Sequence, residues 1–152
     1  MPLRHLQHFL IQTTDLEGTT KWYEDVLGMK RGPHPDFKFP VEWLYLGDED
    51  VPHLTEGGAG VSENRMQYLG QQSTATHGSG VVDHVAFRAD GLKDMLDHLR
   101  SRGEKFQTRQ VSETSLFQIF LIDPNGVKVE LNFENAEAEG IEPELLASED
   151  LA

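Results

Sequence analysis

Hydrophobic and polar residues alternate over two stretches of the chain, and each stretch leads into a pattern with helical spacing. The alternation over 6–12 and over 81–88 predicts two strands. Apolar residues three and four positions apart predict helices over 19–27 and 92–102, and a glycine directly follows each of them, as is common where a helix ends. Two segments of the chain therefore begin with a strand and a helix.

Further strands follow each predicted helix. In the first segment they cover 41–46 and 51–55, and in the second segment they cover 105–110, 118–122 and 127–133. Turn sequences rich in Gly, Asp, Asn and Pro separate the last two strands of each segment. The order of strand, helix and further strands therefore occurs twice.

The two segments align as copies of one repeated unit. His8 in the first strand of the first copy corresponds to His84 in the second copy, an offset of 76 positions. His53 in the last strand of the first copy corresponds to Glu130, an offset of 77 positions. Imidazole and carboxylate groups are common ligands of divalent transition metals. The repeat therefore predicts one metal ligand on the first strand and one on the last strand of each copy.

Period-two alternation gives the predicted strands one polar and one apolar face. The polar face carries His8, Leu10, Gln12, Val51, His53, Thr55, His84, Ala86, Arg88, Lys128, Glu130 and Asn132. The opposite face carries Phe9, Ile11, Leu54, Val85, Phe87, Val129, Leu131 and Phe133. Because a right-handed crossover places the helix on one face of its sheet, we expect the apolar face to pack under the helices and the polar face to line a cavity.

The chain has 152 residues, of which 38% are hydrophobic, and this length suits one domain. We expect that domain to span 1–134, with modules at about 3–56 and 81–134. A Gly-rich segment at 57–80, with a short helix near its middle, lies between the modules and is expected to be either a linker or a functional lid. The acidic segment 135–152 is expected to form a loosely ordered tail.

Charge and composition narrow the classes of partner. The formal net charge of −13 disfavours binding to the phosphate backbone of a nucleic acid. No apolar run approaches the length that spans a bilayer, the first residues show no signal-peptide pattern, and cysteine is absent. We expect a soluble, cytoplasmic protein that binds a small molecule and has neither a disulfide nor a thiolate site.

Four segments, 8–16, 22–29, 83–87 and 123–131, carry a resemblance to a known family. Two motifs stand at the correct places in a two-fold repeat, Tyr-x-x-x-Leu-Gly ending at Gly28 in the first copy and Asp-Pro-x-Gly-x-x-x-Glu-Leu containing Glu130 in the second. In these motifs the chain resembles the vicinal oxygen chelate superfamily, which includes glyoxalase I, extradiol dioxygenases and bleomycin-resistance proteins. The resemblance implies an α+β fold in which two tandem βαβββ modules form a cup-shaped mixed sheet around a metal site. It also implies a homodimer.

The resemblance implies that His8, His53, His84 and Glu130 hold one divalent metal, with Fe(II) preferred over Mn, Ni or Zn. The family usually has Glu or Gln where this chain has His53. Three neutral imidazoles and one carboxylate leave the site more positive than two imidazoles and two carboxylates, which favours an anionic oxygen ligand. Without His53, the remaining three residues form a two-histidine, one-carboxylate set that suits Fe(II) with open positions for substrate and O₂.

The sequence is compatible with three functions. The first is an extradiol-type dioxygenase acting on a small catecholic or vicinally oxygenated metabolite, but Phe120 stands where that subfamily has Tyr, and Val111-Ser112-Glu113 stands where it has a His. The second is a glyoxalase I-like lyase or an epimerase that works through a metal-bound enediolate. The third is a metal-free binding protein of the resistance type.

Further residues are candidates for catalysis and substrate binding. Glu130 is a candidate proton-transfer group, and His77 in the long segment is a second one, although simple solvent exposure is the favoured interpretation of that position. Gln12 and Arg88 occupy the same strand position in the two copies, and Asn132 shares the polar face with Arg88. We assign these three to substrate contacts, with an ion pair to a neighbouring acid as the alternative for Arg88.

Overall fold

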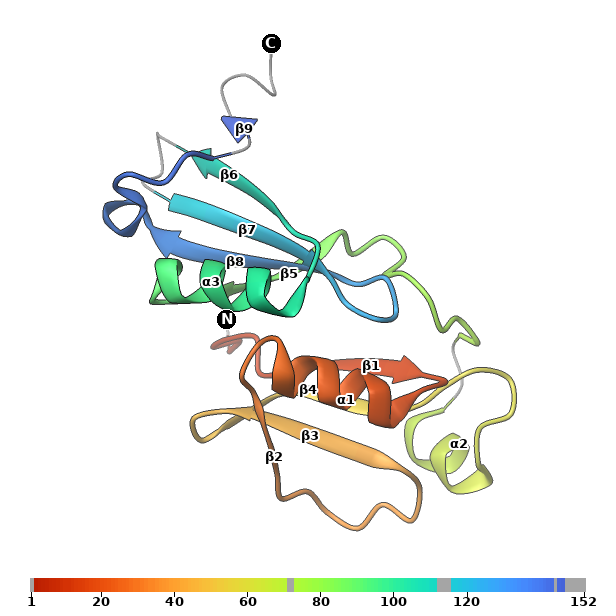
Figure 1. Ribbon diagram of the computed structural model, residues 1–152. Helices are drawn as coiled ribbons and strands as arrows, with labels where there is room; N and C mark the ends of the chain where they lie inside the picture. The colour runs from red at the N-terminus through yellow and green to blue at the C-terminus, as the bar shows by residue number, and fades with distance from the viewer. Residues whose placement is uncertain (1, 71–72, 112–115, 144, 147–152) are drawn as a thin grey trace. The chain divides into compact units, whose positions relative to one another are not determined.

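The computed structural model describes residues 2–70, 73–111, 116–143 and 145–146 of the chain. The chain divides into two compact units, unit 1 (Met1–His77) and unit 2 (Gly78–Ala152). Each unit has one mixed sheet with helices, so the predicted α+β class with two βαβββ modules is confirmed (Figure 1). No helix among the described residues is long and apolar enough to cross a membrane.

Unit 1 begins with a strand and a helix. Its elements are β1 (Phe9–Thr13), α1 (Leu16–Asp25), β2 (Lys30–Gly32), β3 (Val41–Leu46), β4 (Glu49–Glu56) and α2 (Glu63–Leu69). The strand order is β1-β4-β3-β2, with β1 parallel to β4 and the other neighbours antiparallel. The first and last strands of the module are therefore direct neighbours.

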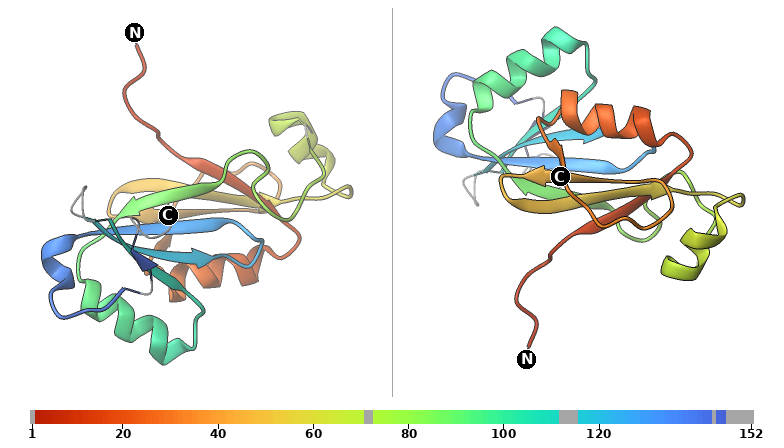
Figure 2. Two further views of the ribbon diagram at one scale, coloured as in Figure 1. Left: turned by 90° about the horizontal axis from the view of Figure 1, so that it is seen from above. Right: turned by 90° about the horizontal axis from the view of Figure 1, so that it is seen from below.

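The α1 helix begins earlier than its apolar pattern predicts. The side chain of Asp15 accepts a hydrogen bond from the backbone N–H of Gly18 at 2.9 Å, so Asp15 caps the helix and Leu16 is its first residue. Tyr23 of α1 is fully buried against the apolar face of the sheet, which includes Leu44 and Leu54. Figure 2 shows α1 lying along one face of its sheet, which leaves the polar face uncovered by this helix.

Unit 2 repeats this arrangement and adds a strand. Its elements are β5 (His84–Arg88), α3 (Leu92–Arg102), β6 (Gln107–Val111), β7 (Leu116–Ile122), β8 (Lys128–Glu134), the 3₁₀ helix η2 (Asn135–Ala138) and β9 (Leu145–Leu146). The strand order is β5-β8-β7-β6-β9, and β5 is parallel to β8. Residues Leu92, Leu96 and Leu99 of α3 and Phe133 of β8 are buried, as the apolar pattern predicts.

Some boundaries differ from those expected from the sequence. The first strand of each unit is shorter than predicted, so His8 lies just before β1 while His84 begins β5. The short strand β2 was not predicted, because Lys30–Gly32 contains no apolar residue that marks a strand. The acidic segment after residue 134 contains η2 and β9, while Glu144, Glu149 and Asp150 lie outside the described residues.

Candidate metal-ligand pairs and adjoining cavities

Unit 1 brings two of the predicted metal ligands together. The rings of His8 and His53 are stacked, with their centroids 3.9 Å apart and an angle of 15° between the ring planes. The ring of Trp43 stacks on His53 as well, at 4.0 Å and 7°. Trp43 is the residue directly opposite His53 in the β3–β4 pairing, so this contact follows from the strand register. The His53 ring therefore lies between an indole and a second imidazole.

The burial of the His53 ring between these two rings affects the pKa of His53. Burial lowers the pKa of His53, and the hydrogen bond with Asp50 opposes that effect without reversing it. The distance from Nε2 of His53 to Oδ2 of Asp50 is 2.6 Å, and the same contact lowers the pKa of Asp50. His53 is thus favoured as a neutral ring that donates its Nε2 proton to a carboxylate, which leaves the lone pair on Nδ1.

Unit 2 brings the other two predicted ligands together. Nε2 of His84 lies 3.6 Å from Oε1 of Glu130. The Glu130 side chain is nearly buried, whereas His84 is more exposed. Nδ1 of His84 is 2.8 Å from Oδ2 of Asp83, and Asp83 also accepts a hydrogen bond from Nζ of Lys128 at 2.8 Å. Lys128 and His84 together lower the pKa of Asp83, so this carboxylate is ionised and accepts the Nδ1 proton of His84.

In each of the four residues, one polar side-chain atom forms a hydrogen bond. Nδ1 of His8 is 3.0 Å from Oε1 of Gln7, and Oε2 of Glu130 accepts a hydrogen bond from Nδ2 of Asn132 at 2.8 Å. In His53 and His84 the partnered nitrogen faces Asp50 and Asp83. Partners of this kind fix the tautomer and orientation of metal-binding histidines. The chemistry of the four donors therefore fits a divalent metal.

The described residues contain no group of three or more His, Asp or Glu side chains placed to hold one ion. His8 and His53 belong to unit 1, and His84 and Glu130 belong to unit 2. The structure thus forms each predicted pair within its own unit, and the assignment of all four residues to a metal stays a prediction.

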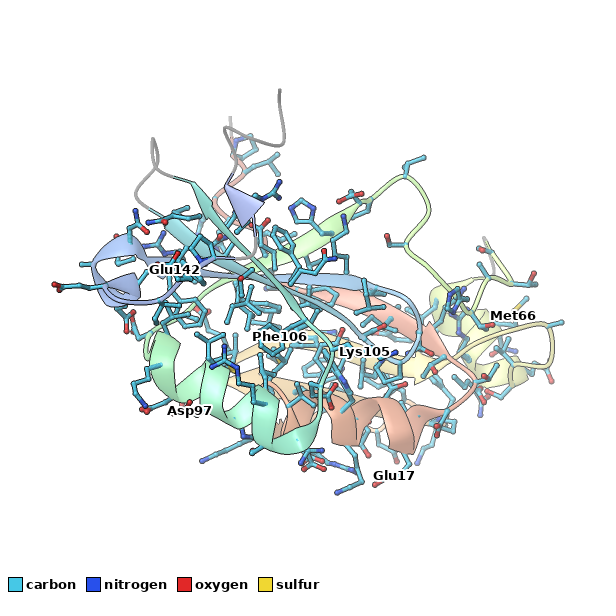
Figure 3. All side chains as sticks on the ribbon, turned by 45° about the horizontal axis from the view of Figure 1, so that its top comes forward. Glu17, Met66, Asp97, Lys105, Phe106 and Glu142 are labelled. Atoms are coloured by element: carbon cyan, nitrogen blue, oxygen red, sulfur yellow. The ribbon has the colours of Figure 1, made fainter. Side chains whose placement is uncertain are left out.

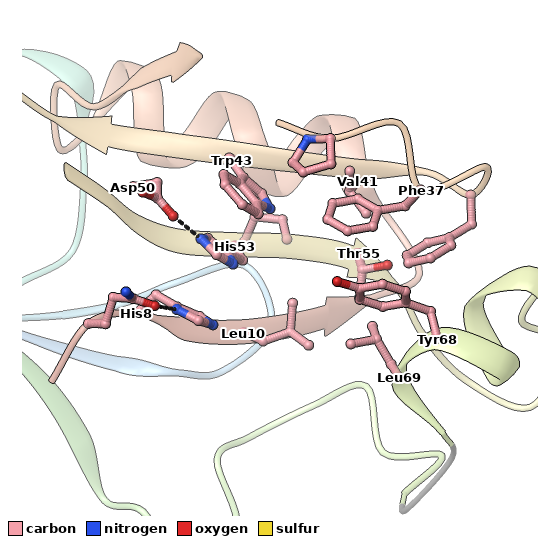
Figure 4. A pocket seen from close by; sticks show the side chains of 14 residues that line it. His8, Leu10, Phe37, Val41, Trp43, Asp50, His53, Thr55, Tyr68 and Leu69 are labelled. Atoms are coloured by element: carbon pink, nitrogen blue, oxygen red, sulfur yellow. Dashed lines mark hydrogen bonds and ion pairs between the residues drawn. The ribbon is translucent and has the colours of Figure 1, made fainter. Parts of the chain in front are cut away.

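A cavity of about 450 Å³ opens beside the His8–His53 pair (Figure 4). One end is polar, with His8, His53 and Asp50. The rest of the wall is mainly aromatic and aliphatic, and includes Leu10, Phe37, Phe39, Val41, Trp43, Tyr68 and Leu69. Within this wall the ring of Phe37 meets that of Tyr68 edge to face, with centroids 4.8 Å apart. A flat apolar molecule with polar groups at one edge matches this lining.

The α2 helix belongs to this wall because a buried arginine attaches it to the sheet. Arg65 is 4% exposed, and its guanidinium donates to Oε1 of Gln12 at 2.9 Å and to the carbonyl of Gly70 at 2.7 Å. The Gln12 amide nitrogen in turn donates to the carbonyls of Ser73 and Ala75. Gln12, a predicted substrate contact, thus holds the segment that carries Tyr68 in place.

The remaining predicted site residues have varied surroundings. Arg88 forms an ion pair with Glu134 on the exposed surface, which is the alternative role considered for it. Asn132 donates to Glu130 and accepts from Gln118 at 3.0 Å, so it is part of a polar network beside the candidate ligand. His77 is exposed at the end of unit 1. Of Val111-Ser112-Glu113, Ser112 and Glu113 lie outside the described residues.

Sequence reasoning missed three residues of these sites. Asp50 follows a turn and Trp43 lies in a strand, and neither position has a special sequence signal. Asp83 immediately precedes His84 and could have been noticed as a carboxylate beside a predicted ligand. The other two become visible once the β3–β4 register is known.

Comparison with known proteins defines the class. Residues 5–131 match the model of the Glyoxalase/Bleomycin resistance protein/Dioxygenase superfamily, and the chain belongs to this superfamily. It is similar to biphenyl-2,3-diol 1,2-dioxygenase 3 of Rhodococcus globerulus, at 30% identity over 135 residues that cover 86% of this chain and 63% of that enzyme. The chain therefore spans less than two thirds of the length of that relative.

Other relatives belong to a different reaction class. The lactoylglutathione lyase of Haemophilus influenzae is 28% identical over 129 residues, which cover 81% of this chain and 87% of that enzyme. Among solved structures, an integron cassette protein from V. cholerae matches with a TM-score of 0.66, at 22% identity, covering 88% of this chain and 97% of that one. A lactoylglutathione lyase from Agrobacterium tumefaciens matches with a TM-score of 0.64, at 14% identity, covering 90% of this chain and 98% of that one. At these identities the solved structures support the fold alone.

Proposed function

We propose that this protein is a metal-dependent enzyme of the extradiol-dioxygenase type, acting on a small catecholic or vicinally oxygenated metabolite. The observation that carries the proposal is the cavity of unit 1, in which two imidazoles face an aromatic wall. An aromatic diol has the same division, because its ring is apolar and its two oxygens lie along one edge. The similarity to a dioxygenase of biphenyl-2,3-diol supports this choice.

Members of the superfamily usually bind a divalent metal. We propose His8, His53, His84 and Glu130 as its ligands, with one ion per chain and Fe(II) as the preferred metal. With His8, His84 and Glu130 alone as ligands, such an ion would supply open coordination positions for two vicinal oxygens and for O₂, whereas His53 as a fourth ligand would leave two open positions. The protein's own contribution is to orient the imidazoles. Burial lowers the pKa of His53 and favours its neutral form, and Asp50 and Asp83 accept hydrogen bonds from the nitrogens of His53 and His84 that face them.

The aromatic wall of unit 1 would orient the substrate ring. Phe37 and Tyr68 meet edge to face and leave an apolar slot beside the imidazoles. Glu130 and His77 remain our candidates for proton transfer. Glu130 fits this role through its nearly buried carboxylate, whose Oε2 is held by Asn132 while Oε1 faces His84.

Metal analysis combined with oxygen uptake tests the proposal. Protein purified without oxygen and loaded with Fe(II) should contain about one metal per chain and should consume O₂ with at least one member of a catechol panel. His8→Ala and Glu130→Ala should lose metal, whereas His98→Ala, on the exposed side of α3, should retain it. Full metal content in both ligand variants would refute the ligand assignment. Fe(II)-loaded protein that binds metal but consumes no O₂ with any catechol would refute the reaction.

A glyoxalase-like isomerisation is the second candidate. It is favoured by Phe120, which lies directly opposite Glu130 in the β7–β8 pairing and brings a phenyl ring without a hydroxyl group to that position. In this reaction Glu130 would move a proton between neighbouring carbon atoms of the substrate. Isomerisation of a hemithioacetal by Ni(II)- or Zn(II)-loaded protein, without O₂ uptake on catechols, would establish this candidate in place of the first.

A further inference from the structure

We propose that Tyr68 is a specificity-determining residue, which favours substrates that carry an apolar substituent on the side away from their two oxygens. Tyr68 lies in α2, outside both repeated modules, and lines the unit 1 cavity (Figure 4). The inference rests on the function proposed above in one respect, because it takes the imidazole end of the cavity as the place of the two oxygens. It adds the part of the chain that selects among such substrates.

The cavity extends from the two imidazoles along β1 and β4. His8 and Leu10 line it on the β1 side, two residues apart. His53 and Thr55 line it on the β4 side at the same spacing. Two residues of a strand cover about 6.6 Å, so a ring whose oxygens meet the imidazoles would lie over Leu10 and Thr55. Figure 4 shows Tyr68 at the end of the cavity away from His8, where a substituent opposite the oxygens would point.

Apolar side chains are exposed around this end of the cavity. Tyr68 is 63% exposed, Leu10 is 44% exposed and Leu69 is 38% exposed, and all three line the cavity. Apolar groups gathered on a concave surface are characteristic of a site that binds an apolar ligand. A substituent bound here would remove that surface from water, which is favourable.

Neighbouring rings hold the ring of Tyr68 in position. The centroid of the Phe37 ring lies 4.8 Å from that of Tyr68, with 64° between the planes, and the centroid of Phe39 lies 6.0 Å away at 50°. Tilted and edge-to-face contacts of this kind are favourable arrangements of aromatic pairs. The loop between the two phenylalanines turns at Lys38, whose φ of 63° lies in a region that residues other than glycine rarely adopt.

The α2 helix is attached to the rest of unit 1 at two points. Nδ2 of Asn64 donates to the carbonyl of Lys38 at 2.9 Å, which joins α2 to the loop between the two phenylalanines. The guanidinium of Arg65 donates to Oε1 of Gln12 at 2.9 Å, which joins α2 to β1. Tyr68 is therefore placed before the ligand arrives, and less entropy is lost there on binding.

Met66 provides a matched control on the same helix, and it is labelled in Figure 3. Its side chain is 41% exposed, and it is not among the described residues that line the cavity. Side chains two positions apart on a helix do not face the same way. Met66→Ala therefore shortens an exposed side chain of α2 without changing the wall to which Tyr68 belongs.

Binding of two catechols tests the preference without turnover. The full chain, as purified and kept under nitrogen, is titrated with catechol and with 4-tert-butylcatechol by calorimetry. Both probes carry the same two oxygens, so the ratio of their dissociation constants reports the substituent alone. We expect 4-tert-butylcatechol to bind at least about tenfold more tightly, which corresponds to ~1.4 kcal/mol. Equal affinities, or no measurable binding of 4-tert-butylcatechol, would overturn the proposal.

Three variants locate the preference. Tyr68→Ala should reduce it from about tenfold to about threefold, because the tyrosine ring is one of several apolar groups around the substituent. Folding is not at risk in this variant, since the side chain is largely exposed. Tyr68→Phe keeps the ring and should retain the full preference, as should Met66→Ala. A preference that is unchanged in Tyr68→Ala, or equally reduced in Met66→Ala, would refute the role of Tyr68.

Oxygen uptake separates this inference from the proposed reaction. A Tyr68-dependent preference in binding, without O₂ uptake on either catechol by Fe(II)-loaded protein, would refute the dioxygenase reaction and support the specificity role. O₂ uptake with the same kcat/KM for both catechols, together with equal affinities, would support the reaction and refute the specificity role.

Discussion

Replacing Gln12 tests whether this residue holds the segment over the unit 1 cavity. The Gln12→Ala change removes the acceptor of a 2.9 Å hydrogen bond from the buried guanidinium of Arg65. Hydrogen bonds to charged groups contribute ~1.5–3 kcal/mol, and the bonds from Gln12 to Ser73 and Ala75 add a smaller amount because they are exposed. We therefore expect Gln12→Ala to lower the free energy of unfolding by about 2–3 kcal/mol.

Urea denaturation and hydrogen exchange provide the measurements. The midpoint should fall without a change in slope, and amides of 57–70 and 73–77 should show a larger increase in exchange rate than those of unit 2. Gln67→Ala makes the same substitution at an exposed position of α2 and should change stability by less than about 0.5 kcal/mol. Gln12→Glu keeps an acceptor for Arg65 and loses the donor to Ser73 and Ala75, so it should retain more stability than Gln12→Ala. Unchanged stability and exchange in Gln12→Ala would refute the anchoring role and favour a direct substrate contact.

Three further predictions concern pH, packing and metal. Because burial lowers the pKa of His53, the unfolded chain takes up a proton below the ordinary value of ~6.5 while the native ring stays neutral. Stability should therefore fall as the pH drops from 7.5 to 5.5, and a urea midpoint that falls equally in His53→Gln would contradict this cause. Phe133→Ala, at a fully buried position of β8, should cost ~3–5 kcal/mol in urea unfolding, against less than ~0.5 kcal/mol for Val82→Ala at an exposed position. A divalent metal at 100 times its Kd should stabilise the wild-type protein by ~2.7 kcal/mol, measured as a higher Tm. The same metal concentration should leave the Tm of Glu130→Gln nearly unchanged, and an equal rise in both proteins would exclude Glu130 as a ligand.

Much of the fold was predictable because each module repeats one pattern of apolar spacing. The bounds of α3 match those read from the sequence, since Leu92, Leu96 and Leu99 form a regular buried stripe. The start of α1 was misplaced by three residues because Glu17 and Gly18 interrupt the apolar pattern, while the capping side chain of Asp15 determines the actual start. Local hydrogen bonds of this kind can override periodicity at the end of a helix.

The sequence indicates which residues are candidate ligands, but it reveals less about the side chains that surround them. The repeat identified which residues to pair within each module, and the structure places His8 with His53 and His84 with Glu130. The stacking of Trp43 on His53 depends on the β3–β4 register, which the sequence does not reveal. The sequence predicts a substrate contact for Gln12, whereas the structure shows a hydrogen bond with Arg65. This partner is 53 positions away, in a helix outside both repeated modules, so the sequence pattern does not indicate it.

The pairing of the first and last strands within each unit has a consequence for how such a protein can change. In the described part of the chain, β1 pairs with β4 and β5 pairs with β8, so each sheet is completed by strands of its own unit. A substitution that alters the donor set of one half leaves the hydrogen-bonded framework of the other half intact. The two halves differ at one such position, since His53 of the first half corresponds to Glu130 of the second. Because each half completes its own sheet, the candidate ligands of one half can change while the strand pairing of both halves is kept.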